Sequence, residues 1–173
     1  MTFIEHLDKN KQTIIEKWFN LIIETYPQDT TRFLKKDQDP FSNPVGNTTR
    51  NNITDLFDQL LTDDVDQAIL LNYLDPILRI RAIQNFSASQ AVGFLLEIKT
   101  IVRKMIGASK ISFDDNDYFR FERRVDQMAL YGFDVFMTCK EKIYDLKANE
   151  VRERSFQVLE RANLIEKTPA TAA

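Results

Sequence analysis

The feature that most constrains the fold of this chain is how rarely its sequence allows a sharp backbone turn. Its 173 residues include only four glycines and five prolines. Folds rich in strands need many tight turns, and tight turns rely on these two residue types, so their scarcity favours long helices. The length corresponds to one ordinary domain and is enough to bury a core without disulfides. The sequence therefore predicts an all-α domain.

Apolar residues recur at intervals of three and four along most of the chain, which is the spacing of one helix face. Ser87 and Gln90 have the spacing of a capping box, which indicates a helix start. A proline clashes inside a helix, so Pro76 is expected to end one helix and begin the next, with Asp75 as its N-cap. The predicted helices are 4–26, 29–36, 47–61, one that ends before Pro76, 76–84, 87–106 and 115–146.

The clearest loop is predicted at residues 37–46, where two prolines and a glycine occur together. Glycine and proline are the strongest signals of irregular structure in a helical sequence. Phe41 and Val45 are expected to hold this loop against the core, because they are its apolar residues. No internal repeat and no second domain are expected.

The last predicted helix carries the most regular apolar pattern in the chain. One series of its residues steps by three and four, close to the heptad seam of packed helices: Val125, Met128, Gly132, Val135, Cys139, Ile143 and Leu146. A polar stretch follows Leu146, after which Phe156, Leu159 and Leu164 restore an apolar face. We therefore expect a domain at 1–148, a helical extension at 149–165 that either docks a partner or folds back, and a disordered tail at 166–173.

Composition limits the chemistry that this chain can perform. With 23 basic and 26 acidic residues the net charge is −3, which gives no support for binding nucleic acid or an anionic membrane. The charged N-terminus and the lack of long apolar runs predict a cytoplasmic protein. The single histidine, His6, is expected to be solvated, and the single cysteine, Cys139, to act as a small hydrophobe rather than a redox sensor. We expect no metal, no cofactor and no enzymatic activity.

Two arginines lie close together in the most distinctive stretch, residues 79–94. Arg79 and Arg81 are two residues apart on a helix, so they point to different sides and at least one is expected to be partly buried. A buried guanidinium needs a partner. Either the arginine ties helix ends to a carboxylate or carbonyl, or it binds a small anionic effector. In the second case, the ligand-binding residues are Arg79, Arg81, Ser87, Ser89 and Gln90.

Several motifs taken together resemble a known family. They are Trp18-Phe19, the TYP at 25–27, the DPFSNPVG at 39–46 and the LDPILRIRAIQNFSASQAVGF at 74–94. In this order and spacing they resemble the RsbRD N-terminal domain family, which is similar to the haem-less, globin-like sensor domains of RsbR-type stressosome proteins. The resemblance implies a globin-like helical domain whose last two helices pair across a homodimer. The heptad-like residues from Val125 to Cys139 would then form the dimer interface.

The sequence departs from that family in one respect and agrees with it in another. RsbR-type proteins carry a C-terminal STAS domain, and no such domain is expected in these 173 residues. A haem would need a histidine near Pro76, and residues 63–86 contain none. The leading hypothesis is thus a non-catalytic signalling module that acts through dimerisation and through a protein partner on its C-terminal helix. The alternative is a sensor of a fatty acid or another amphipathic anion, bound in the globin-like pocket near Arg79 or Arg81.

Overall fold

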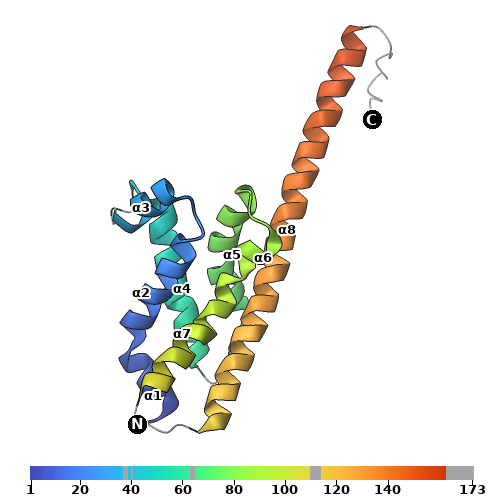
Figure 1. Ribbon diagram of the computed structural model, residues 1–173. Helices are drawn as coiled ribbons and strands as arrows, with labels where there is room; N and C mark the ends of the chain where they lie inside the picture. The colour runs from blue at the N-terminus through green and yellow to red at the C-terminus, as the bar shows by residue number, and fades with distance from the viewer. Residues whose placement is uncertain (37–38, 40, 63–64, 110–113, 163–173) are drawn as a thin grey trace. The chain divides into compact units, whose positions relative to one another are not determined.

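The computed structural model describes residues 1–36, 39, 41–62, 65–109 and 114–162. These residues form eight α-helices and no strand (Figure 1), which confirms the all-α prediction and the long C-terminal helix. The helices are α1 (Phe3–Lys9), α2 (Lys11–Ile23), α3 (Gln28–Lys36), α4 (Pro44–Leu61), α5 (Gln67–Ile83), α6 (Ala88–Val92), α7 (Phe94–Ala108) and α8 (Asp115–Arg161).

The chain divides into two compact units, residues 1–139 and residues 140–173. Helix α8 contributes residues to both, because it runs without interruption from Asp115 to Arg161. The expected boundary after residue 148 therefore lies inside a helix. The tail predicted at 166–173 lies outside the described residues.

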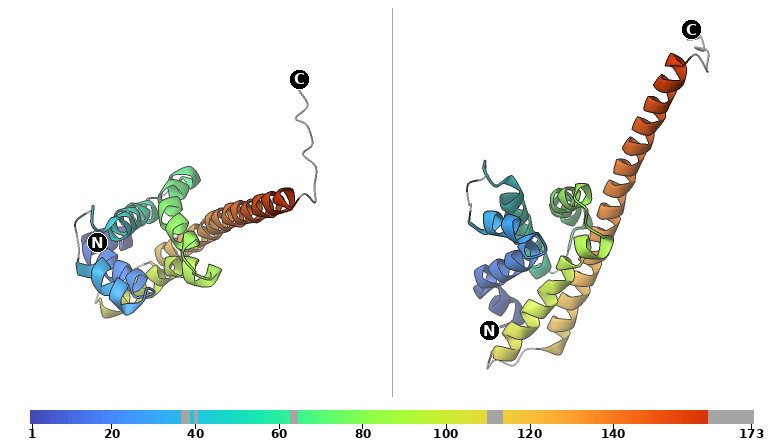
Figure 2. Two further views of the ribbon diagram at one scale, coloured as in Figure 1. Left: turned by 90° about the horizontal axis from the view of Figure 1, so that it is seen from above. Right: turned by 45° about the horizontal axis from the view of Figure 1, so that its top comes forward.

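The core of the first unit lies between α2, α4, α5 and α7. Helix α2 packs against both α4 and α7, and α4 packs against α5 (Figure 2). Trp18 of α2 is fully buried, and its Nε1 donates a hydrogen bond of 2.8 Å to the carbonyl oxygen of Phe94 in α7. The buried ring contributes apolar packing, and its N–H group keeps a hydrogen-bond partner. Both interactions hold α2 against α7.

The first predicted helix is wrong in one respect, because the structure has two helices where the sequence predicts one. Thr2 and Glu5 form a complete capping box at the start of α1. Asn10 then ends α1, and its side-chain Nδ2 donates a hydrogen bond of 2.8 Å to the carbonyl oxygen of His6. An asparagine side chain that bonds to the preceding turn offers the backbone an alternative to a continuous helix.

The predicted break at Pro76 is also wrong, because α5 continues through this residue. Proline costs the helix one hydrogen bond, but Leu74, Ile77 and Leu78 on both sides of it are buried in the same core. Asp75 does not cap a helix there; its carboxylate pairs with Arg79 one turn later. Tertiary packing thus outweighs the local preference of proline.

The helix predicted at 87–106 is divided into α6 and α7 at Gly93. The predicted capping box is confirmed, because Ser87 and Gln90 each bond to the other's backbone. At the division, a Cβ on residue 93 would stand 2.6 Å from the carbonyl oxygen of Ser89. No real Cβ approaches an oxygen so closely, so this turn requires glycine.

The loop before α4 does not pack as predicted. Phe41 is 96% exposed rather than held against the core. Asn43 is buried in its place: its Oδ1 accepts a hydrogen bond from the Gly46 amide, and its Nδ2 donates one to the carbonyl oxygen of Leu34. A polar side chain that caps α4 and satisfies α3 therefore anchors the loop.

Helix α8 lies antiparallel to α7 within the first unit. Lys99 of α7 forms an ion pair with Asp126, and Arg103, one turn later in α7, pairs with Glu122, one turn earlier in α8. One further turn in the same direction places Leu95 and Leu96 of α7 beside the α8 residues around 130.

Candidate functional site

Arg81 is the most deeply buried charged group among the described residues, as the sequence predicts for one of the two arginines. Its side chain is 1% exposed and lies among three aromatic rings. The distances from its Cζ to the ring centres are 4.3 Å for Phe86, 5.2 Å for Phe94 and 5.6 Å for Tyr26. Such contacts are favourable because the ring faces carry negative charge.

The polar partners of Arg81 are neutral. Its Nη2 donates hydrogen bonds of 2.9 Å to Thr25 Oγ1 and 3.1 Å to the carbonyl oxygen of Gln90. Burial lowers the pKa of Arg81 and raises that of Tyr26, since both charged forms lose hydration. Of the two roles considered for the arginine, the structure therefore shows that of a tie between helix ends through a carbonyl.

The five residues expected to bind an anion do not form one open site. Arg79 is exposed and forms its ion pair with Asp75. Ser87 and Gln90 use their side chains to cap α6, and the Ser89 hydroxyl lies 3.2 Å from that of Ser87. The short helix α6 is thus already capped by its own side chains, and aromatic rings cover the guanidinium of Arg81.

The heptad-like residues expected at a dimer interface pack within their own chain. Val125 and Met128 are fully buried, and Gly132 is buried against α7. A Cβ on Gly132 would stand 2.5 Å from Leu95 Cδ1, so glycine permits the close approach of the two helices. These three residues are not free to contact a second copy, because the core of one chain already uses them. Val135 and Cys139 are half-buried.

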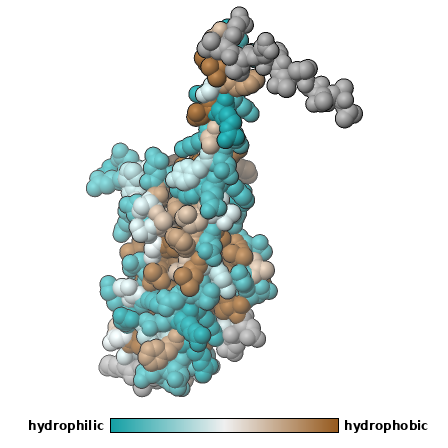
Figure 3. All heavy atoms as spheres, turned by 90° about the vertical axis from the view of Figure 1, so that its right-hand side faces the viewer, coloured by the Kyte–Doolittle hydropathy of each residue, from teal (hydrophilic) through white to brown (hydrophobic). Residues whose placement is uncertain are grey.

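A different set of apolar residues in the first unit is exposed. Leu96 of α7 and Leu130, Phe133 and Met137 of α8 are between 37% and 62% exposed. The antiparallel register of the two helices brings Leu96 close to Leu130 and Phe133. Figure 3 shows apolar side chains gathered on the side of this unit where α8 lies. We call these four residues the α7–α8 apolar surface.

The second unit has an exposed apolar row of its own on α8. Tyr144, Val151 and Val158 are all more than 60% exposed and follow one another at intervals of seven residues. Leu130 and Met137 have the same spacing in the first unit. This regular interval was the sequence signal that could have revealed both surfaces. Phe156 and Leu159, expected to dock a partner, are exposed as well, while Leu164 lies outside the described residues.

The single histidine, His6, and the single cysteine, Cys139, are both shielded from solvent at least in part. His6 is buried at 8% exposure, not solvated as expected, because α1 lays it against the domain. Across the residues that the structure describes, no cluster of metal-ligating side chains is present. In the same residues, every helix is too short or too polar to span a bilayer.

The described residues define a protein of the all-α class, whose longest helix buries one apolar stripe and exposes a second. Within that class the sequence relationship is specific. The family described as RsbT co-antagonist protein rsbRD N-terminal domain matches residues 12–151, and the chain belongs to this family. It is therefore a signalling and regulatory domain of the stressosome type, and the resemblance seen in its motifs is confirmed.

Two further comparisons set the limits of this relationship. An uncharacterized protein from Archaeoglobus fulgidus is 19% identical over 145 residues, which cover 82% of this chain and 84% of that protein. No solved structure matches the chain. The globin-like topology therefore stays a prediction.

Proposed function

We propose that this chain is a regulatory domain that acts as a homodimer and contacts a protein partner through the end of α8. The observation that carries the proposal is the exposed α7–α8 apolar surface. Single exposed apolar residues are ordinary, but neighbouring ones on two packed helices are typical of interaction sites. Such a role fits the cytoplasmic location expected from the sequence.

The dimer is proposed to bury Leu96, Leu130, Phe133 and Met137 against the same residues of a second copy. A two-fold interface uses one surface twice, so a self-complementary apolar surface is sufficient. Charged groups border this surface: the ion pair of Lys99 with Asp126 and the exposed Asp134, one turn after Leu130. This arrangement, a polar rim around an apolar centre, is that of stable interfaces.

The exposed row Tyr144, Val151 and Val158 is proposed to pair with its counterpart in a parallel helix of the second copy. Residues that repeat every seven positions meet the same residues of the partner in such a pair. Phe156 lies five residues after Val151, about 140° further around the helix. Phe156 and Leu159 would therefore remain available to a protein partner while the row is paired.

Molar mass in solution tests the dimer. The wild-type chain should elute with about twice its mass of 20.2 kDa in size-exclusion chromatography with light scattering. The double variant Leu130→Glu/Phe133→Glu should be a folded monomer, because two buried carboxylates oppose association. Phe41→Glu is the matched control, since it places the same charge on an exposed aromatic residue elsewhere. A wild-type monomer, or a double variant that stays dimeric, would refute this interface.

Disulfide trapping tests the parallel pairing of the row. In a Cys139→Ser background, Val151→Cys should form a covalent dimer under mild oxidation, while Arg152→Cys on the adjacent face should not. An antiparallel or unpaired row predicts no preference for position 151. That result would leave the row, rather than Phe156 and Leu159, as the surface for the partner.

A further inference from the structure

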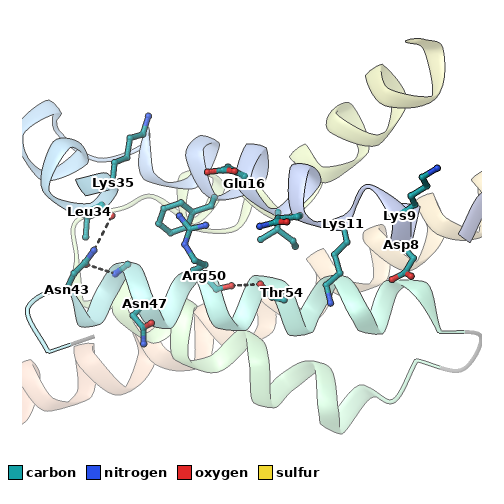
Figure 4. Close-up of a pocket in the computed structure, with 14 residues that line it drawn as sticks. Asp8, Lys9, Lys11, Glu16, Leu34, Lys35, Asn43, Asn47, Arg50 and Thr54 are labelled. Carbon is teal, nitrogen blue, oxygen red and sulfur yellow. Dashed lines mark hydrogen bonds between the residues drawn. The ribbon is translucent and has the colours of Figure 1, made fainter. Parts of the chain in front are cut away.

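A groove of about 740 Å³ lies between α2 and α4 in the first unit, far in sequence from the proposed dimer surface. The end of α1 and the helix α3 contribute to its ends. This volume is within the range of sites that hold small molecules. Figure 4 shows side chains from both walls directed into the space between the two helices.

The floor of the groove is apolar and firmly held. Ile15, Phe19 and Leu34 line it, and all three are buried. Asn43, which also lines the groove, joins α3 to α4 through its bonds to Leu34 and Gly46. A ligand would thus meet a pre-formed surface, and little ordering would be needed on binding.

Positive charge predominates among the lining residues. Four of them are basic (Lys9, Lys11, Lys35 and Arg50) and two are acidic (Asp8 and Glu16). Lys11 and Lys35 already have partners in Asp58 and Glu24. The other charged lining residues have no ion-pair partner among the described residues; Asp8, Lys9 and Glu16 are exposed, whereas Arg50 is half-buried.

Arg50 lies in the middle of the α4 wall and reaches toward α2 (Figure 4). Its Cζ is 3.9 Å from the centre of the Phe19 ring, so the guanidinium is held in place by the ring face. Within the described ranges of the chain, no carboxylate pairs with this half-buried cation. A stacked guanidinium presents its N–H groups at a fixed angle, which suits a planar anion.

Asn47 supplies a second polar group beside Arg50. It lies three residues earlier in α4, and residues at this interval share a helix face. Its side chain also lines the groove, and its side-chain amide forms no hydrogen bond to another group of the structurally described chain. Arg50 and Asn47 thus give the α4 wall of the groove one charged and one neutral polar side chain.

We propose that this groove binds a small organic anion, in which a carboxylate or phosphate group is attached to a flat apolar body. The anionic group would accept hydrogen bonds from Arg50 and Asn47. The apolar body would lie on Phe19, Ile15 and Leu34. The ligand would bridge α2 and α4. The proposal does not depend on dimerisation, because none of these residues belongs to α7 or α8.

Titration of the full-length protein with three probes tests the proposal. Benzoate and phenyl phosphate carry the two candidate anionic groups, and benzamide is the neutral analogue of benzoate. In ¹H–¹⁵N spectra, at least one anion should shift the Gly46 and Thr54 amides and the Asn47 side chain, with saturation. Benzamide should bind at least tenfold more weakly. The stronger of the two anions shows whether the groove prefers a carboxylate or a phosphate group. Shifts outside the groove, or equal binding of benzamide, would overturn the proposal.

Variants of Arg50 separate charge from stacking. Arg50→Met should weaken binding of the preferred anion at least tenfold, and Arg50→Lys should weaken it less because it keeps the charge. Arg79→Met is the control, since it removes an exposed arginine outside the groove. Unchanged binding in Arg50→Met would refute the site. The benzamide comparison needs no variant and decides the question even if that variant is unstable.

Discussion

The guanidinium carbon of Arg81 lies 4.3 Å from the centre of the Phe86 ring, where the chain passes from α5 toward α6. The cation is buried without a carboxylate partner among the described residues and is balanced by ring faces, a hydroxyl and a carbonyl. It therefore joins the end of α2, the end of α5 and α6 at one point.

Arg81 is expected to stabilise the fold mainly through the volume that it fills. Arg81→Ala should lower the free energy of unfolding by about 2–4 kcal/mol, as for other large buried side chains. Arg81→Met should cost less, about 1 kcal/mol, because it fills most of the space and removes a buried charge. Urea denaturation followed by the fluorescence of Trp18 measures both. If Met costs as much as Ala, the charge itself is required.

A side chain at residue 132 should destabilise the domain. Gly132→Ala places a methyl group against Leu95, a fully buried residue, and should cost about 1–3 kcal/mol. Gly107→Ala is the matched control, because a Cβ there meets nothing within 4 Å and the position is helical. This control should stabilise the protein by about 0.5–1 kcal/mol. Thermal unfolding of the two variants should therefore shift in opposite directions.

Pro76 should lower the free energy of unfolding without preventing α5 from forming. Pro76→Ala restores the amide donor to the carbonyl of Asn72 inside α5 and should raise the free energy of unfolding by about 1–2 kcal/mol. Chemical denaturation measures the gain. A loss of stability would instead mean that the proline geometry is needed to seat Leu74 and Ile77.

Glu122 should make the stability of the domain sensitive to acid. Burial by itself would raise its pKa, but the hydrogen bond from Tyr118 and the ion pair with Arg103 together hold the pKa below the ordinary value of 4.5. A carboxyl group whose pKa is lowered on folding contributes stability above its ordinary pKa, and this contribution is lost as the pH falls through the folded value.

Glu122→Gln tests that dependence. The variant should be less stable than wild type at pH 7, and the difference should shrink as the pH is lowered below 4.5. Unfolding curves of both proteins at a series of pH values give the difference directly. A difference that stays constant with pH would assign the effect to packing rather than to charge.

Local signals in the sequence predicted much of the helical structure. The capping box predicted at Ser87 is confirmed, because a cap depends on residues only three positions apart. The prediction that Arg79 and Arg81 point to different sides is confirmed for the same reason: helical spacing is a local property. The family was also evident from motifs that lie along the chain in order.

Predictions that depended on contacts between residues far apart in the sequence were less successful. The break at Pro76 is absent because buried neighbours hold α5 together, and the helix at 4–26 is divided at Asn10. The groove could not have been predicted, since Arg50 and Phe19 are thirty-one residues apart and meet only when α2 packs on α4.

The sequence by itself determined the all-α class, most helix starts, the burial of one arginine and the family. These follow from composition, from spacing within one turn and from ordered motifs. The tertiary structure alone decided which of the two apolar faces of α8 is buried. Val125 and Met128 pack inward because Gly132 lets α7 approach on that side, and Leu130, Phe133 and Met137 are left on the surface. Helical periodicity reveals an apolar face, but only packing selects its partner.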